Sequence, residues 1–186
     1  GYGSFGSRAG SRAKGLVHNG ADDNASGTSG VLLAAQVLSD QYRLMPAGAS
    51  ARSIIFIAFS GEESGLLGSR FFTRHAPMDV KSISLMLNMD MIGRIRSNKL
   101  DISGTGSAEG LEAFIKPMVD ESGLTIRMLP GGSGPSDHAS FYGVEVPVLA
   151  LFSGMHTTYH MPEDLRWQIN PVGATKAVNL LTKIAA

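Results

Sequence analysis

The sequence predicts an α/β fold of three layers, in which helices cover both faces of an open, mostly parallel central sheet. One observation is a pair of continuous apolar runs of strand length, SIIFIAF (53–59) and VPVLALF (146–152). Such runs are typical of strands that are buried on both faces of a parallel sheet. The other observation is that strand-like and helix-like stretches alternate along the chain, as they do in α/β proteins.

Five stretches have helical patterns. Residues 26–44 carry a broad apolar face with Ser and Thr near the start, and residues 62–75 have acids at the positive end and Arg and His at the negative end. Residues 107–123 predict a helix that is kinked or ended near Pro117, and residues 136–143 predict a short one. The closing helix, 171–186, has proline at its first position, where the missing N–H costs nothing.

Five stretches are typical of strands. Besides the two apolar runs, residues 82–90 (SISLMLNMD) alternate apolar and polar side chains with the period of a strand. Shorter strands are expected at 99–103 and 124–129. Because ligands of open α/β sheets bind beyond the carboxyl ends of the strands, we expect functional side chains at that edge.

The composition indicates one globular domain, residues 1–186, and excludes several classes of function. Sixteen Lys and Arg balance sixteen Asp and Glu, so no bulk charge favours nucleic acid. The absence of cysteine excludes disulfides, thiolate metal sites and cysteine nucleophiles. The longest apolar runs are too short for a membrane span. No signal peptide is visible, so composition leaves the compartment open.

Acidic side chains and one histidine gather where the predicted strands end. They come from four segments and are Asp22, Asp23, Glu62, Glu63, Asp90 and His160. Singly, each has an ordinary explanation: a turn former, a helix-dipole partner or a surface histidine. Together, the carboxylates would repel one another unless a cation neutralised them. Carboxylate and imidazole ligands favour zinc.

The two adjacent glutamates fit such a site. Neighbouring side chains at a turn point in different directions, so one can bind the metal while the other faces water. Zinc lowers the pKa of bound water to about 7. A carboxylate beside that water can take its proton and pass it to a leaving amine.

Five motifs span about residues 19–170: NGADDNASGTSGVLLAA, FIAFSGEESGLLGSRFF, LNMDMIG, SDHASFYGVEVPVLALFSG and YHMPED. In these motifs and in their order the chain resembles the co-catalytic zinc aminopeptidase family, whose superfamily includes glutamate carboxypeptidases and glutaminyl cyclases. The resemblance implies a zinc exopeptidase-like αβα fold with a mixed central sheet. It also favours an extracytoplasmic or secreted location.

The resemblance assigns roles residue by residue. It implies that Asp22 bridges two zinc ions and that Asp23 is joined to it through a strained peptide bond. Glu62 matches the general base, Glu63 and His160 match ligands of one zinc, and Asp90 matches a ligand of the other. Asp137 and His138 match polar residues that line the pocket.

One motif of the family has no counterpart. The family carries a His-x-Asp pair on an upstream strand, and residues 1–17 contain neither the pair nor such a strand. We therefore expect the chain to begin after this pair, to lack N-terminal strands, and to hold one zinc ion better than the two of an intact domain. His18, four residues before Asp22, is an alternative ligand of the second zinc ion. Family members often have the stretch HNGADD together with the upstream histidine, which argues against this alternative.

The expected function is a zinc-dependent aminopeptidase that hydrolyses peptides from a free amino terminus. Two alternatives stay open: a one-zinc glutaminyl cyclase-like aminoacyltransferase, and a non-catalytic binding domain with a degraded metal site. Retention of Glu62, which a purely structural site does not need, favours an enzyme. The expected partners are a peptide substrate and an N-terminal segment or accessory domain, and neither nucleic acid nor a membrane is expected.

Overall fold

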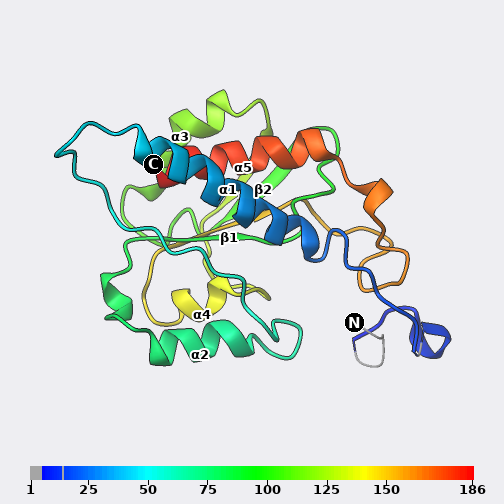
Figure 1. Cartoon of the computed structure of the whole chain (residues 1–186). Helices are drawn as coiled ribbons and strands as arrows, with labels where there is room; N and C mark the ends of the chain where they lie inside the picture. The colour runs from blue at the N-terminus through cyan, green and yellow to red at the C-terminus, as the bar shows by residue number, and fades with distance from the viewer. Residues whose placement is uncertain (1–5, 14) are drawn as a thin grey trace.

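The computed structural model describes residues 6–13 and 15–186, which form three layers (Figure 1). The central sheet has the strand order β1-β4-β2-β3, with β1 at Met86–Met89, β2 at Lys99–Ser103, β3 at Thr125–Leu129 and β4 at Val148–Phe152. The β1–β4 and β2–β3 pairs are parallel, and the β2–β4 pair is antiparallel. The sheet is therefore mixed and mostly parallel.

Helices cover both faces of the sheet. Figure 1 shows α1 (Ala25–Arg43), α3 (Leu111–Glu121) and α5 (Pro171–Ala185) on one face, and α2 (Leu67–His75) and α4 (His138–Tyr142) on the other. Single-turn 3₁₀ helices lie in the connections, at Gly10–Ala13, Val80–Ser82 and Arg166–Gln168.

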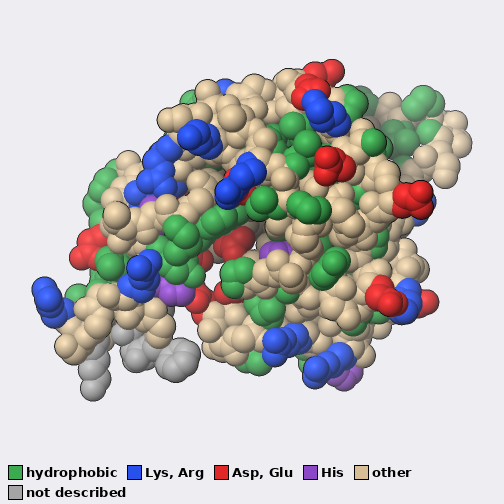
Figure 2. Space-filling view, turned by 180° about the vertical axis from the view of Figure 1, so that it is seen from behind, with side chains coloured by type: hydrophobic (Ala, Val, Ile, Leu, Met, Phe, Trp, Pro, Cys, Tyr) green, Lys and Arg blue, Asp and Glu red, His purple; other side chains and the backbone are tan. Residues whose placement is uncertain are grey.

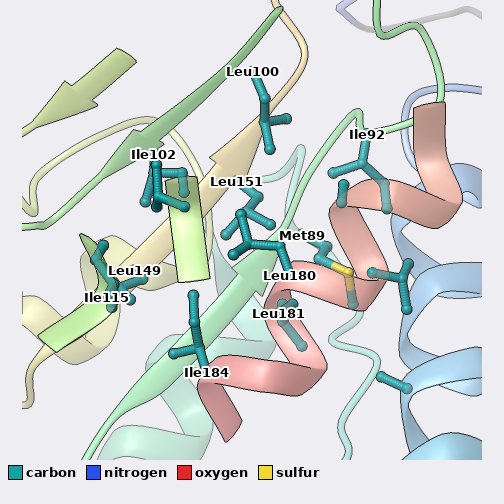
Figure 3. Close-up of a cluster of buried hydrophobic side chains, with 14 of the residues drawn as sticks. Met89, Ile92, Leu100, Ile102, Ile115, Leu149, Leu151, Leu180, Leu181 and Ile184 are labelled. Carbon is teal, nitrogen blue, oxygen red and sulfur yellow. The ribbon is translucent and has the colours of Figure 1, made fainter. Parts of the chain in front are cut away.

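The main core lies between the sheet and the layer formed by α1, α3 and α5 (Figure 3). Ile102 and Leu151, on adjacent strands, are fully buried and pack with Ile115 of α3 and Leu180 of α5. A smaller cluster on the other face joins Phe141 of α4 to Val148 of β4. These aliphatic contacts fix the strand ends from which the candidate site is built.

Local signals explain where two helices begin. The Asn24 side chain accepts the N–H of Gly27 at the start of α1, and the Asn170 side chain accepts the N–H of Gly173 at the start of α5. Gly27 also permits close packing, since a Cβ there would collide with the carbonyl oxygen of Met89. The amino end of α1 is thereby held against the carboxyl end of β1.

The three-layer α/β prediction is confirmed, but the strand expected at 53–59 is wrong. This segment has no strand pairing, and its side chains include Ile55 at 51% exposure and Phe56 at 41%. A strand needs a hydrogen-bonded neighbour, and none of the described strands pairs with this segment. The apolar composition of this segment therefore led to neither strand pairing nor full burial.

Several boundaries also differ from prediction. The helix expected from Glu62 begins only at Leu67, because residues 61–66 form a turn. The strand expected over 82–90 is shorter, with a 3₁₀ turn before it. The helix through Pro117 does not end there and continues to Glu121. None of the helices in the described part of the chain is both long and apolar enough to cross a membrane.

Candidate metal centre

Asp23, Glu63 and His160 form the one group in the described residues whose side chains could hold a metal ion. His160 Nε2 lies 3.1 Å from Asp23 Oδ2 and 2.9 Å from Glu63 Oε1, and one ligand atom of each residue lies within 4.8 Å of the others. Asp23 and His160 are partly buried, whereas Glu63 is exposed. Two carboxylates and an imidazole are a donor set that suits zinc.

Further carboxylates line a pocket beside this group. The cavity volume is about 210 Å³. Its lining includes the acidic side chains of Asp23, Glu62, Glu63, Asp90 and Asp137. Figure 2 shows acidic side chains recessed in a hollow on the back of the molecule, with histidine close by. The structure thus brings together acids from four segments of the chain.

Burial and mutual repulsion raise the pKa values of these acids. Burial and the neighbouring carboxylates, Glu63 first, raise the pKa of Asp23 to about 8. Burial and the charges of Asp90, Glu63 and Asp137 raise the pKa of Glu62 to about 7. Burial likewise raises the pKa of Asp90. Such crowding disfavours the ionised forms, and a bound cation would reverse this effect.

Glu62 and Glu63 lie on a turn, so a helix-dipole role does not account for them. The N–H groups of Gly65 and Leu66 donate to the Glu62 carbonyl, and the N–H of Leu67 donates to the Gly61 carbonyl. These bonds bend the chain between residues 53–59 and α2. They leave the Glu63 side chain against His160, while Glu62 lines the adjoining pocket.

Asp23, and not Asp22 as the sequence suggested, belongs to the group that could hold a metal ion. Asp22 is fully buried, and its Oδ1 accepts the N–H of Gly93 at 2.7 Å and the hydroxyl of Ser26 at 3.0 Å. Its Oδ2 lies 3.3 Å from Nε2 of His156, away from the metal-ligating group. The unusual peptide bond that the resemblance placed between Asp22 and Asp23 lies one residue later, as a cis peptide bond between Asp23 and Asn24. The geometry therefore favours Asp23 over Asp22 as a ligand.

His160 is held from both sides. Its Nδ1 lies 3.1 Å from the carbonyl oxygen of Gly6, and its ring stacks on Tyr159 with centroids 3.7 Å apart. The N–H of Arg8 donates to the His160 carbonyl. A carbonyl at Nδ1 favours a proton on that nitrogen and leaves Nε2 to face the carboxylates.

The remaining predicted residues lie at the edge of this arrangement. Asp137 lines the pocket, and His138 is buried with neither ring nitrogen hydrogen-bonded to any described residue. His18 contacts Ser7 Oγ at 2.8 Å and the Leu16 carbonyl at 3.2 Å and does not belong to the metal-ligating group. The structure therefore does not support His18 as a ligand in place of the upstream histidine.

Sequence reasoning missed two buried residues near the site. His156 contacts Asp22, and Asp164 accepts the backbone N–H groups of both Asp22 and Asp23. Their spacing from His160, four residues on either side, was the only available signal. In a loop that spacing defines no common face, so it carried no prediction.

Comparison with known proteins decides the family. The model of peptidase family M28 matches residues 6–185. The chain belongs to peptidase family M28. Aminopeptidase YwaD of Bacillus subtilis is 31% identical over 177 residues, which cover 88% of this chain and 36% of that protein.

Solved structures of other proteins share the fold. The zinc aminopeptidase BSAP of Bacillus subtilis is similar with a TM-score of 0.73 and 28% identity, covering 89% of this chain and 41% of BSAP. The glutaminyl cyclase of Porphyromonas gingivalis matches with a TM-score of 0.66 at 15% identity, which shows the fold alone. The chain spans less than half the length of YwaD or BSAP.

Proposed function

We propose that this M28 chain carries the catalytic site of a zinc-dependent aminopeptidase. The observation that carries the proposal is the convergence of Asp23, Glu63 and His160, with Glu62 and Asp90 lining the same pocket. YwaD is named an aminopeptidase and BSAP a zinc aminopeptidase, which supports the same assignment for this chain. The substrate class is a peptide with a free amino terminus.

Asp23, Glu63 and His160 are the proposed protein ligands of one zinc ion. Three protein ligands are the usual number in a catalytic zinc site, where another position stays open. When bound, zinc supplies Lewis acidity toward a carbonyl oxygen and toward water. His160 would bind the ion through Nε2, which faces the two carboxylates, while its Nδ1 faces the Gly6 carbonyl.

Glu62 is the proposed general base. Its carboxylate takes a proton from the attacking water and returns it to the leaving amine, so that the peptide bond breaks and the water is divided between the two products. Its neighbour Glu63 contacts His160, so the two glutamates of the turn carry different tasks. Asp137 and His138 support the pocket wall.

Asp90 is the proposed ligand of a second, weaker metal position. It lines the same pocket as Asp23, and no histidine of the described residues joins the two in a metal-ligating group. Two carboxylates without an imidazole suit magnesium or calcium better than zinc. We therefore expect residues 1–186 to hold one zinc ion more tightly than a second.

An additional N-terminal segment is proposed to complete the sheet and this second position. Among the described strands, β1 pairs only with β4, so its other edge has no strand partner. Across the pocket lies the apolar, unpaired segment 53–59, whose Ile57 and Phe59 share the lining with Met86 and Asn88. A strand between them that ends in a histidine would supply the imidazole that Asp90 lacks.

Two assays on the purified chain test the proposal. Elemental analysis after dialysis is expected to find zinc, and hydrolysis of an aminoacyl anilide is expected to depend on it. Ammonia release from an amino-terminal glutamine without anilide hydrolysis would establish the cyclase alternative instead. Absence of retained zinc together with absence of both activities would favour the binding-domain alternative.

A further inference from the structure

The loop that carries His160 contacts the Asp22–Asp23 pair at three points. His156 Nε2 lies 3.3 Å from Asp22 Oδ2, and His160 Nε2 lies 3.1 Å from Asp23 Oδ2. The third point is Asp164, whose Oδ2 accepts the N–H groups of Asp22 at 2.9 Å and Asp23 at 3.0 Å. These contacts join two segments that are 142 positions apart in the sequence.

We propose that Asp164 is a positioning residue for the metal centre. Its carboxylate holds the Asp22–Asp23 backbone so that the Asp23 side chain points toward His160 while the Asp22 side chain points into the core. The inference rests on the proposed function, because Asp23 and His160 are the ligands that it aligns. Asp164 itself is not part of the metal-ligating group.

The burial of Asp164 makes its two hydrogen bonds consequential. The residue is 1% exposed, and its backbone carbonyl also accepts the N–H of Ala21. Buried backbone N–H groups need acceptors, and a carboxylate is a stronger acceptor than a neutral oxygen. One carboxylate oxygen therefore fixes two consecutive peptide units, which leaves little freedom for the direction of Asp23.

Contacts on the opposite side of the turn complete this constraint. The Asn24 side chain accepts the N–H of Met91 at 3.2 Å and donates to the carbonyl of Met89 at 3.1 Å, which ties the turn to the end of β1. Asn24 therefore fixes the turn relative to the sheet. Asp164 fixes it relative to His160, because both residues belong to the same loop.

The choice of Asp164 over its neighbours follows from what each contact controls. Within the Asp22–Asp23 pair, His156 contacts only the Asp22 side chain, which is already bonded to Gly93 and Ser26. Loss of His156 leaves those bonds in place. Loss of the Asp164 carboxylate frees the two amides that set the direction of Asp23.

The test compares Asp164→Ala and Asp164→Asn with the parent and with Asp120→Ala, an exposed control that pairs with Lys116. Amide hydrogen exchange at Asp22 and Asp23 is followed by NMR in the metal-free chain. Zinc affinity is measured by competition with a chelator, and thermal unfolding is recorded for each variant. The first readout needs no metal, so it is independent of the proposed function.

In Asp164→Ala, both amides are expected to exchange faster, and zinc affinity is expected to fall by about 10–100-fold, as for other residues that orient metal ligands. Asp164→Asn should show the same changes in weaker form, because an amide oxygen is a weaker acceptor than a carboxylate. Asp120→Ala should match the parent. A purely structural role would lower the unfolding temperature and leave zinc affinity unchanged.

Two results would overturn the inference: unchanged exchange at both amides, or parental zinc affinity in Asp164→Ala whatever its stability. If Asp164→Ala does not fold, parental exchange and affinity in Asp164→Asn overturn it instead. If the parent binds no zinc and hydrolyses no anilide, the proposed function fails. The exchange rates then decide by themselves whether Asp164 fixes the turn.

Discussion

The two acidic turns of the candidate site differ in how they are held. The turn at 22–24 is tied to distant parts of the chain, through Asp164 on one side and the end of β1 on the other. The turn at 61–66 is held by backbone bonds to itself and to the start of α2. One turn is anchored to the core by side-chain hydrogen bonds, whereas the other follows a largely exposed, unpaired segment whose main packing contact is Phe59 against Phe72 and Phe141.

This contrast indicates that half of the site is pre-organised and half is not. Asp23 and His160 keep their relative position because buried hydrogen bonds fix both segments. Glu63 is exposed, and its turn makes few contacts beyond its own neighbourhood. A metal ion that binds all three must order the second turn, and ordering costs conformational entropy.

The first prediction tests whether the loosely held turn nevertheless carries the chemistry. Glu62→Gln is expected to lower anilide hydrolysis by about 10²–10⁴-fold, the usual contribution of a general base. Zinc content should stay nearly unchanged, because Glu62 is assigned proton transfer and not ligation. Steady-state rates and elemental analysis of the same preparation measure both quantities.

The matched control for this change is Glu109→Gln, at an exposed glutamate outside the pocket. It should keep both activity and zinc. Loss of zinc in Glu62→Gln, or activity within a few-fold of the parent, would reverse the roles of the two glutamates.

The second prediction compares the two turns through metal affinity. Asp23→Ala, Glu63→Ala and His160→Ala each remove one proposed ligand. Residues that only orient a metal ligand contribute about 10–100-fold to affinity, so loss of a ligand itself should weaken zinc binding by at least as much. The loss should be greater for Asp23 and His160 than for Glu63, because only the first two are pre-organised. Chelator competition measures all three. Equal or smaller losses at Asp23 and His160 would contradict the contrast.

The third prediction separates Asp22 from Asp23. Asp22→Ala leaves the N–H of Gly93 without its acceptor and removes the carboxylate that faces the Ser26 hydroxyl and His156, so it should lower the free energy of unfolding by about 1–3 kcal/mol. Zinc stoichiometry should not change. Asp23→Asn should instead reduce zinc binding. It should not lower the free energy of unfolding of the metal-free chain, because it removes a carboxylate that its acidic neighbours repel. Denaturant unfolding and metal titration of both variants check this pairing.

A loss of zinc in Asp22→Ala with intact stability would restore Asp22 as the ligand that the motif alone suggested. Asp22→Asn serves as the isosteric comparison. Its amide oxygen can still accept from Gly93 and Ser26, so its destabilisation should be the smaller one.

Most of the fold could be predicted because its signals are local. The strand at 99–103 and the helix from Pro171 were found to within a residue, since a short β pattern and a proline beside an asparagine cap define them. The segment 53–59 was not, because strand pairing depends on neighbouring strands and burial depends on covering helices, and neither depends on its own composition alone. A continuous apolar run says nothing about whether those neighbours are present.

Of the group that could hold a metal ion, the sequence named Glu63 and His160 as ligands but chose Asp22 in place of Asp23. The motif brought the right turns together, yet the choice between Asp22 and Asp23 depends on which peptide units Asp164 holds. That contact joins residues 142 positions apart, and no local pattern encodes it. The same reason hid the contact of His156 with Asp22.

The last prediction concerns the exposed segment that carries the second turn. Ile55→Val and Ile102→Val remove the same methyl group from side chains that are 51% and 0% exposed. The buried change should cost about 0.5–1.5 kcal/mol of unfolding free energy, and the exposed one should stay within about ±0.5 kcal/mol. Denaturant unfolding of the two variants gives the difference directly. Equal costs would mean that residues 53–59 are buried in solution, so that the turn bearing Glu62 and Glu63 is anchored as firmly as the turn bearing Asp23.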